Sequence, residues 1–224
     1  MRELSDMGKE SIEVRIPIGP IYLNGNLDIP EGARGFVVFV HGSGSSRFSP
    51  RNQYVAQEMQ KDGLGILLFD LLTEEEEEID MLTRSFRFDI DLLSKRLVDV
   101  TRWLLNRPDT KGLNLGYFGA STGAAAALIA ARELKEVVKA VVSRGGRPDL
   151  AGEGLMYVEA PTLFIVGGDD TEVIELNQWA LERMVLAEKE LKIVPGATHL
   201  FEEQGALEKV ARLAGDWFIR FLGK

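Results

Sequence analysis

The amino-acid sequence predicts an α/β fold, a mostly parallel, doubly wound sheet of about eight strands with helices on both faces. Three observations support this class. Short runs of β-branched and aromatic residues occur without polar alternation, as in strands buried on both faces of a parallel sheet. Longer amphipathic segments separate these runs. Strands that alternate with helices imply right-handed crossovers, and we expect a single domain over residues 1–224.

The strands are expected in two groups. Residues 12–18 alternate between apolar and polar side chains, and residues 21–29 follow a turn at Gly19 and Pro20. These two segments therefore predict an antiparallel hairpin. The remaining strands are expected at residues 35–40, 65–69, 113–118, 139–142, 161–166 and 191–194.

Helical patterns lie between these strands. Ser49 precedes Pro50, which predicts a capped helix that runs to about residue 61. Apolar side chains recur at helical spacing over residues 90–104 and again over residues 207–221. Each of these two segments predicts an amphipathic helix.

One segment has a strong charge bias. Residues 74–78 are five consecutive glutamates, which repel one another. We therefore interpret residues 73–80 as a solvated loop or a frayed helix. The alternative is that residues 73–87 form a mobile flap over the site.

The composition limits the chemistry and the partners. The chain of 224 residues has 26 basic and 35 acidic residues and a net charge of −9, which argues against nucleic acids and anionic membranes as partners. It contains no cysteine, which excludes thiol nucleophiles, and only two histidines, His41 and His199. The N-terminal residues lack an apolar signal segment, and residues 123–131 are too short an apolar stretch to cross a bilayer. We expect a cytoplasmic protein that acts on a small molecule without a metal or cofactor; its oligomeric state is left open.

A nucleophile motif follows the strand expected at residues 113–118. Residues 119–123 read Gly-Ala-Ser-Thr-Gly, and an alanine-rich helical segment comes next. This G-x-S-x-G pattern between strand and helix is typical of a nucleophile elbow, in which a sharp turn exposes the serine hydroxyl. Ser121 is therefore the candidate nucleophile. The alternative is that Ser121 only caps the helix.

A serine nucleophile needs a base, and the base needs an acid. Where an elbow is present, the chain order is serine, acid, histidine, so His199 is the candidate base and His41 is expected to be structural. Two carboxylates, Asp169 and Asp170, follow the strand at residues 161–166. The spacing G-x-x-D-x-x-V favours Asp170 as the acid, and the other aspartate is expected to cap the helix that begins near Val173.

Backbone N–H groups are expected to stabilise the oxyanion of an acyl-transfer reaction. Thr122, directly after the nucleophile, supplies one of them, and Ser43, in the glycine-rich turn after residues 35–40, supplies the second. Gly42 and Gly44 allow a ligand to approach the backbone there. This turn lacks the G-K-[ST] ending of a phosphate-binding loop.

With these motifs in order, the chain resembles the α/β-hydrolase superfamily, and within it the dienelactone hydrolase-like branch. The resemblance implies an α/β-hydrolase fold, a triad of Ser121, Asp170 and His199, and Ser43 and Thr122 as the oxyanion hole. True dienelactone hydrolases carry cysteine as the nucleophile, so Ser121 favours a general esterase. The large cap that lipases insert after the sixth strand has no counterpart in residues 142–161.

The predicted function is that of a serine hydrolase that cleaves small carboxylic esters through an acyl-enzyme. Thioesterase or peptidase activity is an alternative, as is a non-catalytic protein that binds a small ligand or a protein partner. Substrate-binding residues are not identified. Five arginines are expected at the carboxyl edge of the sheet, where they either bind a carboxylate-bearing substrate or are simply solvated. Arg144 and Arg147 lie at the end of the sixth strand, and Arg47, Arg84 and Arg87 lie in loops.

Overall fold

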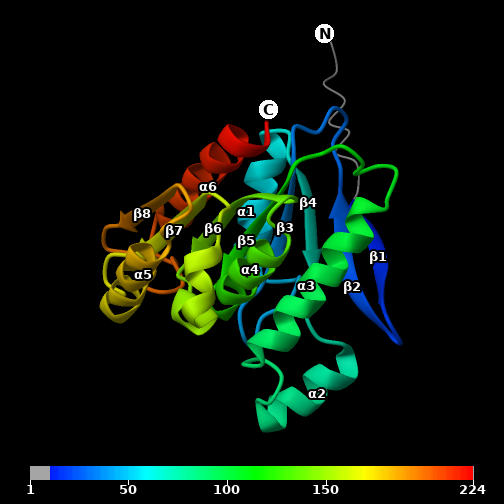
Figure 1. Ribbon diagram of the computed structural model, residues 1–224, viewed down its shortest axis with the longest axis horizontal. Coiled ribbons are helices and arrows are strands. Elements are labelled where there is room, and N and C mark those ends of the chain that lie inside the picture. Colours follow the sequence, from blue (N-terminus) through cyan, green and yellow to red (C-terminus); the bar gives the residue numbers. More distant parts are fainter. Residues whose placement is uncertain (1–10, 224) are drawn as a thin grey trace.

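The computed structural model describes residues 11–223, which form one eight-stranded sheet in the order β1-β2-β4-β3-β5-β6-β7-β8 (Figure 1). β1 pairs antiparallel with β2, and β2 pairs antiparallel with β4, whereas all other neighbours are parallel. The predicted mostly parallel sheet with an N-terminal hairpin is therefore confirmed. The strands are β1 Ile12–Ile18, β2 Ile21–Asp28, β3 Phe36–Val40, β4 Gly65–Phe69, β5 Leu115–Ala120, β6 Val138–Arg144, β7 Thr162–Gly167 and β8 Lys189–Val194.

Helices cover both faces of the sheet (Figure 1). α1 and α6 pack together on one face, and α3, α4, α5 and the 3-10 segment η1 lie on the other. The helical elements are α1 Pro50–Lys61, α2 Glu74–Thr83, α3 Ile90–Leu105, α4 Thr122–Glu133, η1 Pro148–Tyr157, α5 Thr171–Arg183 and α6 Ala206–Leu222.

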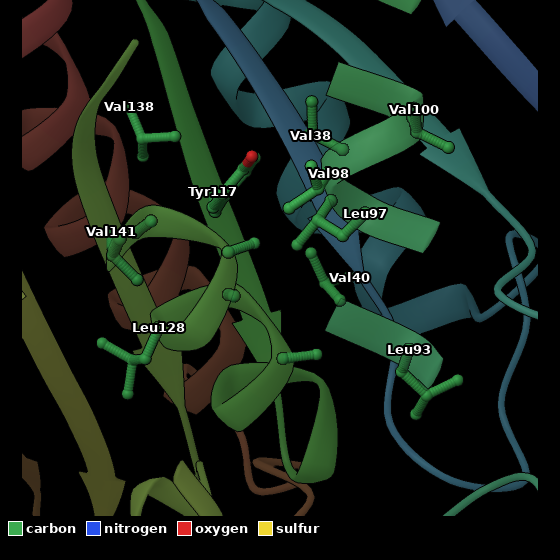
Figure 2. Packing of buried hydrophobic residues seen from close by; sticks show 14 of the residues in the cluster. Val38, Val40, Leu93, Leu97, Val98, Val100, Tyr117, Leu128, Val138 and Val141 are labelled. Carbon is green, nitrogen blue, oxygen red and sulfur yellow. The ribbon is translucent and has the colours of Figure 1, made fainter. Parts of the chain in front are cut away.

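The two-sided covering explains the unbroken apolar runs. In β3, Val38 and Val40 belong to the core beneath α3 and α4, while Val37 and Phe39 belong to the core beneath α1 and α6. Figure 2 shows the first of these cores, where the Tyr117 side chain of β5 lies among valines and leucines. Its hydroxyl forms a hydrogen bond of 2.7 Å with Thr101, which satisfies the polar end of this buried ring.

The glutamate run is a capped helix, so the prediction of a loop or a frayed helix is wrong. The Thr73 hydroxyl accepts a hydrogen bond from the Glu76 N–H, and the Glu76 carboxylate accepts one from the Thr73 N–H, which is a capping box at the start of α2. Glu76 also pairs with Arg96 of α3 at 2.6 Å. Acidic side chains at a helix N-terminus interact favourably with its dipole, and this offsets their mutual repulsion.

The parallel strands all end at one edge of the sheet, where sites of open α/β folds form. At this edge, β6 and β7 are joined by η1 and short loops, with no inserted cap within the described chain. No helix among residues 11–223 is long and apolar enough to cross a membrane.

Candidate active site

Ser121 lies in a strained turn between β5 and α4. Its φ of 50° and ψ of −122° fall where non-glycine residues are rare. Gly123 is required here, because a Cβ at this position would lie 2.2 Å from the carbonyl oxygen of Val40. Ser121 occupies the N-cap position of α4, yet its side chain forms no capping hydrogen bond. The turn therefore fixes the position of Ser121, and the Ser121 hydroxyl forms no hydrogen bond with the helix N-terminus.

The histidine and the acid meet across the ends of β7 and β8. His199 Nδ1 and Asp170 Oδ2 are 2.6 Å apart, so the ring N–H donates to the carboxylate. Asp170 also stands at the N-cap of α5 without a side-chain capping bond, whereas the neighbouring Asp169 is exposed. The expectation that the second aspartate caps this helix is thus wrong, because Asp170 itself occupies that position and its carboxylate is turned to the imidazole.

The loop after β6 contacts both the serine and the imidazole residue. The Ser121 N–H donates to the Arg144 carbonyl at 3.2 Å. The next residue, Gly145, has a φ of +50°, and a Cβ built on it would lie 3.5 Å from His199 Nδ1. The structure thus brings Ser121, His199 and Asp170 to one short stretch of the sheet edge.

The two predicted oxyanion donors also meet, in a way that the sequence does not reveal. The Ser43 N–H donates to Thr122 Oγ1 at 2.9 Å, and the two hydroxyls are 3.2 Å apart. Thr122 is the first residue of α4, so its own N–H has no acceptor within the helix. Gly42 completes the turn, since a Cβ there would lie 2.9 Å from Ser121 Cβ. The Ser43 N–H, one of the two predicted oxyanion donors, is therefore already hydrogen-bonded to a side-chain oxygen.

His41 links the oxyanion turn to the next strand. Its Nε2 accepts a hydrogen bond of 3.0 Å from the Leu71 N–H, and its Nδ1 donates to the Gly42 carbonyl at 2.9 Å. Burial lowers the pKa of His41, although the Gly42 carbonyl opposes this shift. A neutral ring with both nitrogens engaged holds the turn and has no free nitrogen for base catalysis.

The five arginines of the site edge have different surroundings. Arg47 pairs with Asp70, Arg87 with the buried Asp80, and Arg147 with Asp149 at 2.7 Å. Arg84 is exposed at the end of α2. Arg144, in contrast, is buried, and its Nε and Nη1 have no hydrogen-bond partner within the described chain.

A cleft opens beside the oxyanion turn. Its volume is ≈ 550 Å³, and it is lined by the β3–α1 loop, by Asp70 and by the first turn of α2. Gly44 and Phe48 contribute to its wall, whereas Ser121 and His199 do not line it. The cleft therefore adjoins the oxyanion turn without containing the proposed nucleophile.

The sequence matches a family model. Residues 25–222 match the model of the dienelactone hydrolase family, which spans both the elbow and the His–Asp pair.

Solved structures share the fold. A dienelactone hydrolase from Anabaena variabilis is 59% identical, with a TM-score of 0.93 over 95% of this chain and 98% of that one. An esterase from Pyrococcus furiosus is 21% identical, with a TM-score of 0.76 over 96% and 92% of the two chains. An α/β serine hydrolase without a lid from Xanthomonas campestris is 21% identical, with a TM-score of 0.75 over 96% and 97%. The fold is therefore the α/β-hydrolase fold without a lid.

Two curated relatives differ in length from this chain. These proteins of Mycobacterium tuberculosis, from strains CDC 1551 and H37Rv, are named provisionally as phosphoribosyl transferases. Each is 58% identical over 210 residues, which is 94% of this chain and 46% of the relative. The chain thus spans less than half the length of the curated relatives it matches.

Proposed function

Because this chain belongs to the dienelactone hydrolase family, we propose that it is a serine hydrolase that cleaves small carboxylic esters through an acyl-enzyme. The observation that carries the proposal is the hydrogen bond of 2.6 Å between His199 and Asp170, beside an elbow serine whose hydroxyl caps no helix. This arrangement has the parts that acyl transfer requires: a nucleophile, a base and an acid that orients the base.

The reaction proceeds in two halves. His199 Nε2 takes the Ser121 hydroxyl proton as Oγ attacks the ester carbonyl carbon, and the tetrahedral intermediate places its negative charge on the former carbonyl oxygen. The imidazolium then gives this proton to the leaving oxygen as the C–O bond breaks. In the second half, water loses a proton to His199 and attacks the acyl-enzyme; the same proton returns to Ser121 Oγ as the acid is released.

The oxyanion turn must change during this cycle. The Thr122 N–H donates to the oxyanion from the helix N-terminus, while the Ser43 N–H exchanges Thr122 Oγ1 for the substrate oxygen. The Thr122 hydroxyl keeps the Ser43 N–H satisfied and the turn in place before substrate arrives. A lidless site leaves this edge open, which suits small substrates.

The name of the curated relatives raises a second activity, phosphoribosyl transfer. An elbow serine and a His–Asp pair serve acyl transfer and have no evident part in moving a phosphoribosyl group. We therefore assign the transferase name to the portion of those relatives that this chain does not match. Incubation of this chain with a phosphoribosyl diphosphate donor and a free nucleobase should release no pyrophosphate. Release above the protein-free control would contradict the assignment.

Covalent labelling tests the proposed function directly. A fluorophosphonate probe should label the intact protein at Ser121, and Ser121→Ala should remove the label, as located by mass spectrometry of the tryptic peptides. Ser45→Ala, which changes a serine of the adjacent loop, should keep it. A folded protein that neither takes the label nor hydrolyses any short-chain aryl ester would instead favour a non-catalytic binding protein.

The leaving group is the next question for the same site. Matched oxygen and thiol esters of one short acid, together with an amide of that acid, separate esterase from thioesterase and peptidase activity. We expect the highest kcat/KM for the oxygen ester. A clear preference for the thioester would assign the protein to the thioesterases.

A further inference from the structure

Arg144 is a buried cation that the proposed chemistry does not use. Its exposed fraction is 8%, and its Nε and Nη1 are buried without a hydrogen-bond partner among residues 11–223. Removal of a charge from water is costly unless an opposite charge or hydrogen bonds replace the lost hydration. The other buried or half-buried arginines of this edge have that compensation, because Arg47, Arg87 and Arg147 each pair with an aspartate.

The neighbours of Arg144 increase this cost. Arg51, in the first turn of α1, is close enough to disfavour its charge, and together with burial it lowers the pKa of Arg144 to about 10. At neutral pH the guanidinium therefore still carries its charge beside a second cation. Phe201, whose ring centre is 6.0 Å from the Arg144 Cζ, offers only an aromatic face.

Arg51 is held from the solvent side by a weak partner. Its Nη1 lies 3.0 Å from Glu202 Oε1, and the Glu202 side chain is 64% exposed. Exposed ion pairs of this kind contribute little to stability and exchange readily with other anions. Arg51 also lines the cleft beside the oxyanion turn. An incoming anion can therefore compete with Glu202 for Arg51, the cation next to Arg144.

The position of Arg144 relates it to one side of the reaction. The oxyanion donors approach Ser121 from β3, because Gly42 packs against the Ser121 Cβ. His199 approaches from β8 and packs against Gly145, the residue after Arg144. Since His199 must protonate the leaving oxygen, the leaving group lies on the side of His199 and Arg144.

We propose that Arg144, assisted by Arg51, binds a compact anionic group, a carboxylate or a phosphate, on the leaving group of the ester substrate. The inference rests on the proposed esterase function. The unpartnered Nε and Nη1 of a buried guanidinium, one peptide away from the glycine that supports His199, are the observation that carries it. A planar guanidinium binds a carboxylate or phosphate through paired hydrogen bonds.

Matched substrates test where the anion binds. Methyl para-acetoxybenzoate has a neutral leaving group, and para-acetoxybenzoate and para-acetoxyphenyl phosphate carry a carboxylate and a phosphate on the leaving group. Phenyl hydrogen succinate carries its carboxylate on the acyl group instead. We expect the wild-type kcat/KM to be higher for the two substrates with an anionic leaving group than for the one with a neutral leaving group. The anionic substrate with the higher kcat/KM then shows whether the site prefers a carboxylate or a phosphate. No preference, or a preference only for the succinate, would overturn the proposal.

Variants then test the residue. Arg144→Met should lower the ratio of kcat/KM for the anionic over the neutral leaving group by about 10- to 100-fold, the range for loss of a hydrogen-bonded charge. Arg144→Lys should restore part of this ratio. Glu202→Gln should raise it, because it removes the competing carboxylate. Arg84→Met changes an exposed arginine of the same edge and should leave the ratio unchanged. A ratio that Arg144→Met does not alter would refute the assignment.

A binding measurement separates this inference from the proposed function. In the Ser121→Ala background, calorimetry with para-hydroxybenzoate and para-hydroxyphenyl phosphate reports anion binding without turnover. Binding lost in Ser121→Ala/Arg144→Met but kept in Ser121→Ala/Arg84→Met supports the anion site even if no ester is hydrolysed. Ester hydrolysis without any Arg144-dependent binding or selectivity would leave the esterase and refute the anion site.

Discussion

Two adjacent carboxylates at the end of β7 have different surroundings. Asp170 accepts the hydrogen bond from His199, whereas Asp169 is exposed and its N–H donates to the Ala197 carbonyl. An asparagine at the acid position of such a triad keeps the shape but disfavours the productive tautomer of the imidazole. The division of roles therefore depends on which carboxylate the imidazole contacts.

This difference makes a paired prediction. Asp170→Asn should lower kcat for a neutral aryl ester by about 10³- to 10⁴-fold, and Asp169→Asn should change it by less than about threefold. Steady-state kinetics on both variants, with circular dichroism to confirm folding, provides the measurement. Equal losses would mean that the two side chains share the task.

His41 makes stability depend on pH. Its pKa in the folded protein lies below its ordinary value of 6.5, so the unfolded chain takes up a proton before the folded one does. The free energy of unfolding should therefore fall as the pH decreases below 6.5, by up to about 1.4 kcal/mol per pH unit from this group. Urea titrations between pH 7 and pH 5 measure this slope, in the wild type and in His41→Gln.

Comparison of the wild type with His41→Gln separates the contribution of the buried His41 ring from that of other groups that titrate over this pH range. His41→Gln should show a smaller slope than the wild type over this pH range. If His41→Gln retained the full slope, the acid sensitivity would have to come from other groups.

At the scale of elements, α2 shows what local sequence can and cannot predict. Its five glutamates look unfavourable when only neighbours in sequence are considered. The helix forms because Thr73 caps it and because Arg96, twenty residues later, pairs with Glu76. Thr73 and Glu76 already form a capping-box pattern in the sequence, and that was the available signal. The partner on α3 could not be foreseen, since it depends on how the helices pack.

Two glutamates of the run, the ion-paired Glu76 and the exposed Glu78, allow a matched test of the Glu76–Arg96 pair. Glu76 is 20% exposed, and Arg96 pairs with it and donates to the Leu71 carbonyl. Burial alone raises the pKa of Glu76, but the Arg96 guanidinium and Thr73 hold it below its ordinary value. Glu76→Gln should lower the free energy of unfolding by about 1–3 kcal/mol, because a buried guanidinium loses its charged partner. Glu78→Gln, on an exposed side chain, should change it by less than about 0.5 kcal/mol in urea denaturation. Equal losses of stability in the two variants would show that the ion pair between Glu76 and Arg96 does not stabilise the fold.

In the candidate site too, some features can be predicted from the sequence and others cannot. Chain order predicts Ser121 and His199, because an elbow motif and the scarcity of histidine leave few choices. Two features depend on three-dimensional contacts and are absent from any local pattern. One is the hydrogen bond from the Ser43 N–H to Thr122 Oγ1, across 79 positions, and the other is the missing partner of Arg144.

At the scale of the whole molecule, one sheet lies between two apolar cores. The apolar runs predict the sheet well, since burial on both faces leaves a strong local signal. Phe218 of α6 packs against Gly116 of β5, where a Cβ would lie 2.6 Å from its ring. Leu97 of α3 is fully buried on the opposite face. The five strands β3 to β7 therefore contribute side chains to both cores. Loss of either core should unfold the sheet that the other core requires.

This coupling predicts that residues 11–223 unfold as one unit. Phe218→Ala and Leu97→Ala should each lower the free energy of unfolding, by about 3–5 and 2–5 kcal/mol respectively. In both variants, far-ultraviolet circular dichroism and tryptophan fluorescence should report the same midpoint, because the residual core has no separate sheet to support it. Trp217 lies on the Phe218 face and Trp103 on the Leu97 face, so the fluorescence samples both layers. Two separated transitions, with one layer melting before the other, would show that the layers fold as independent units.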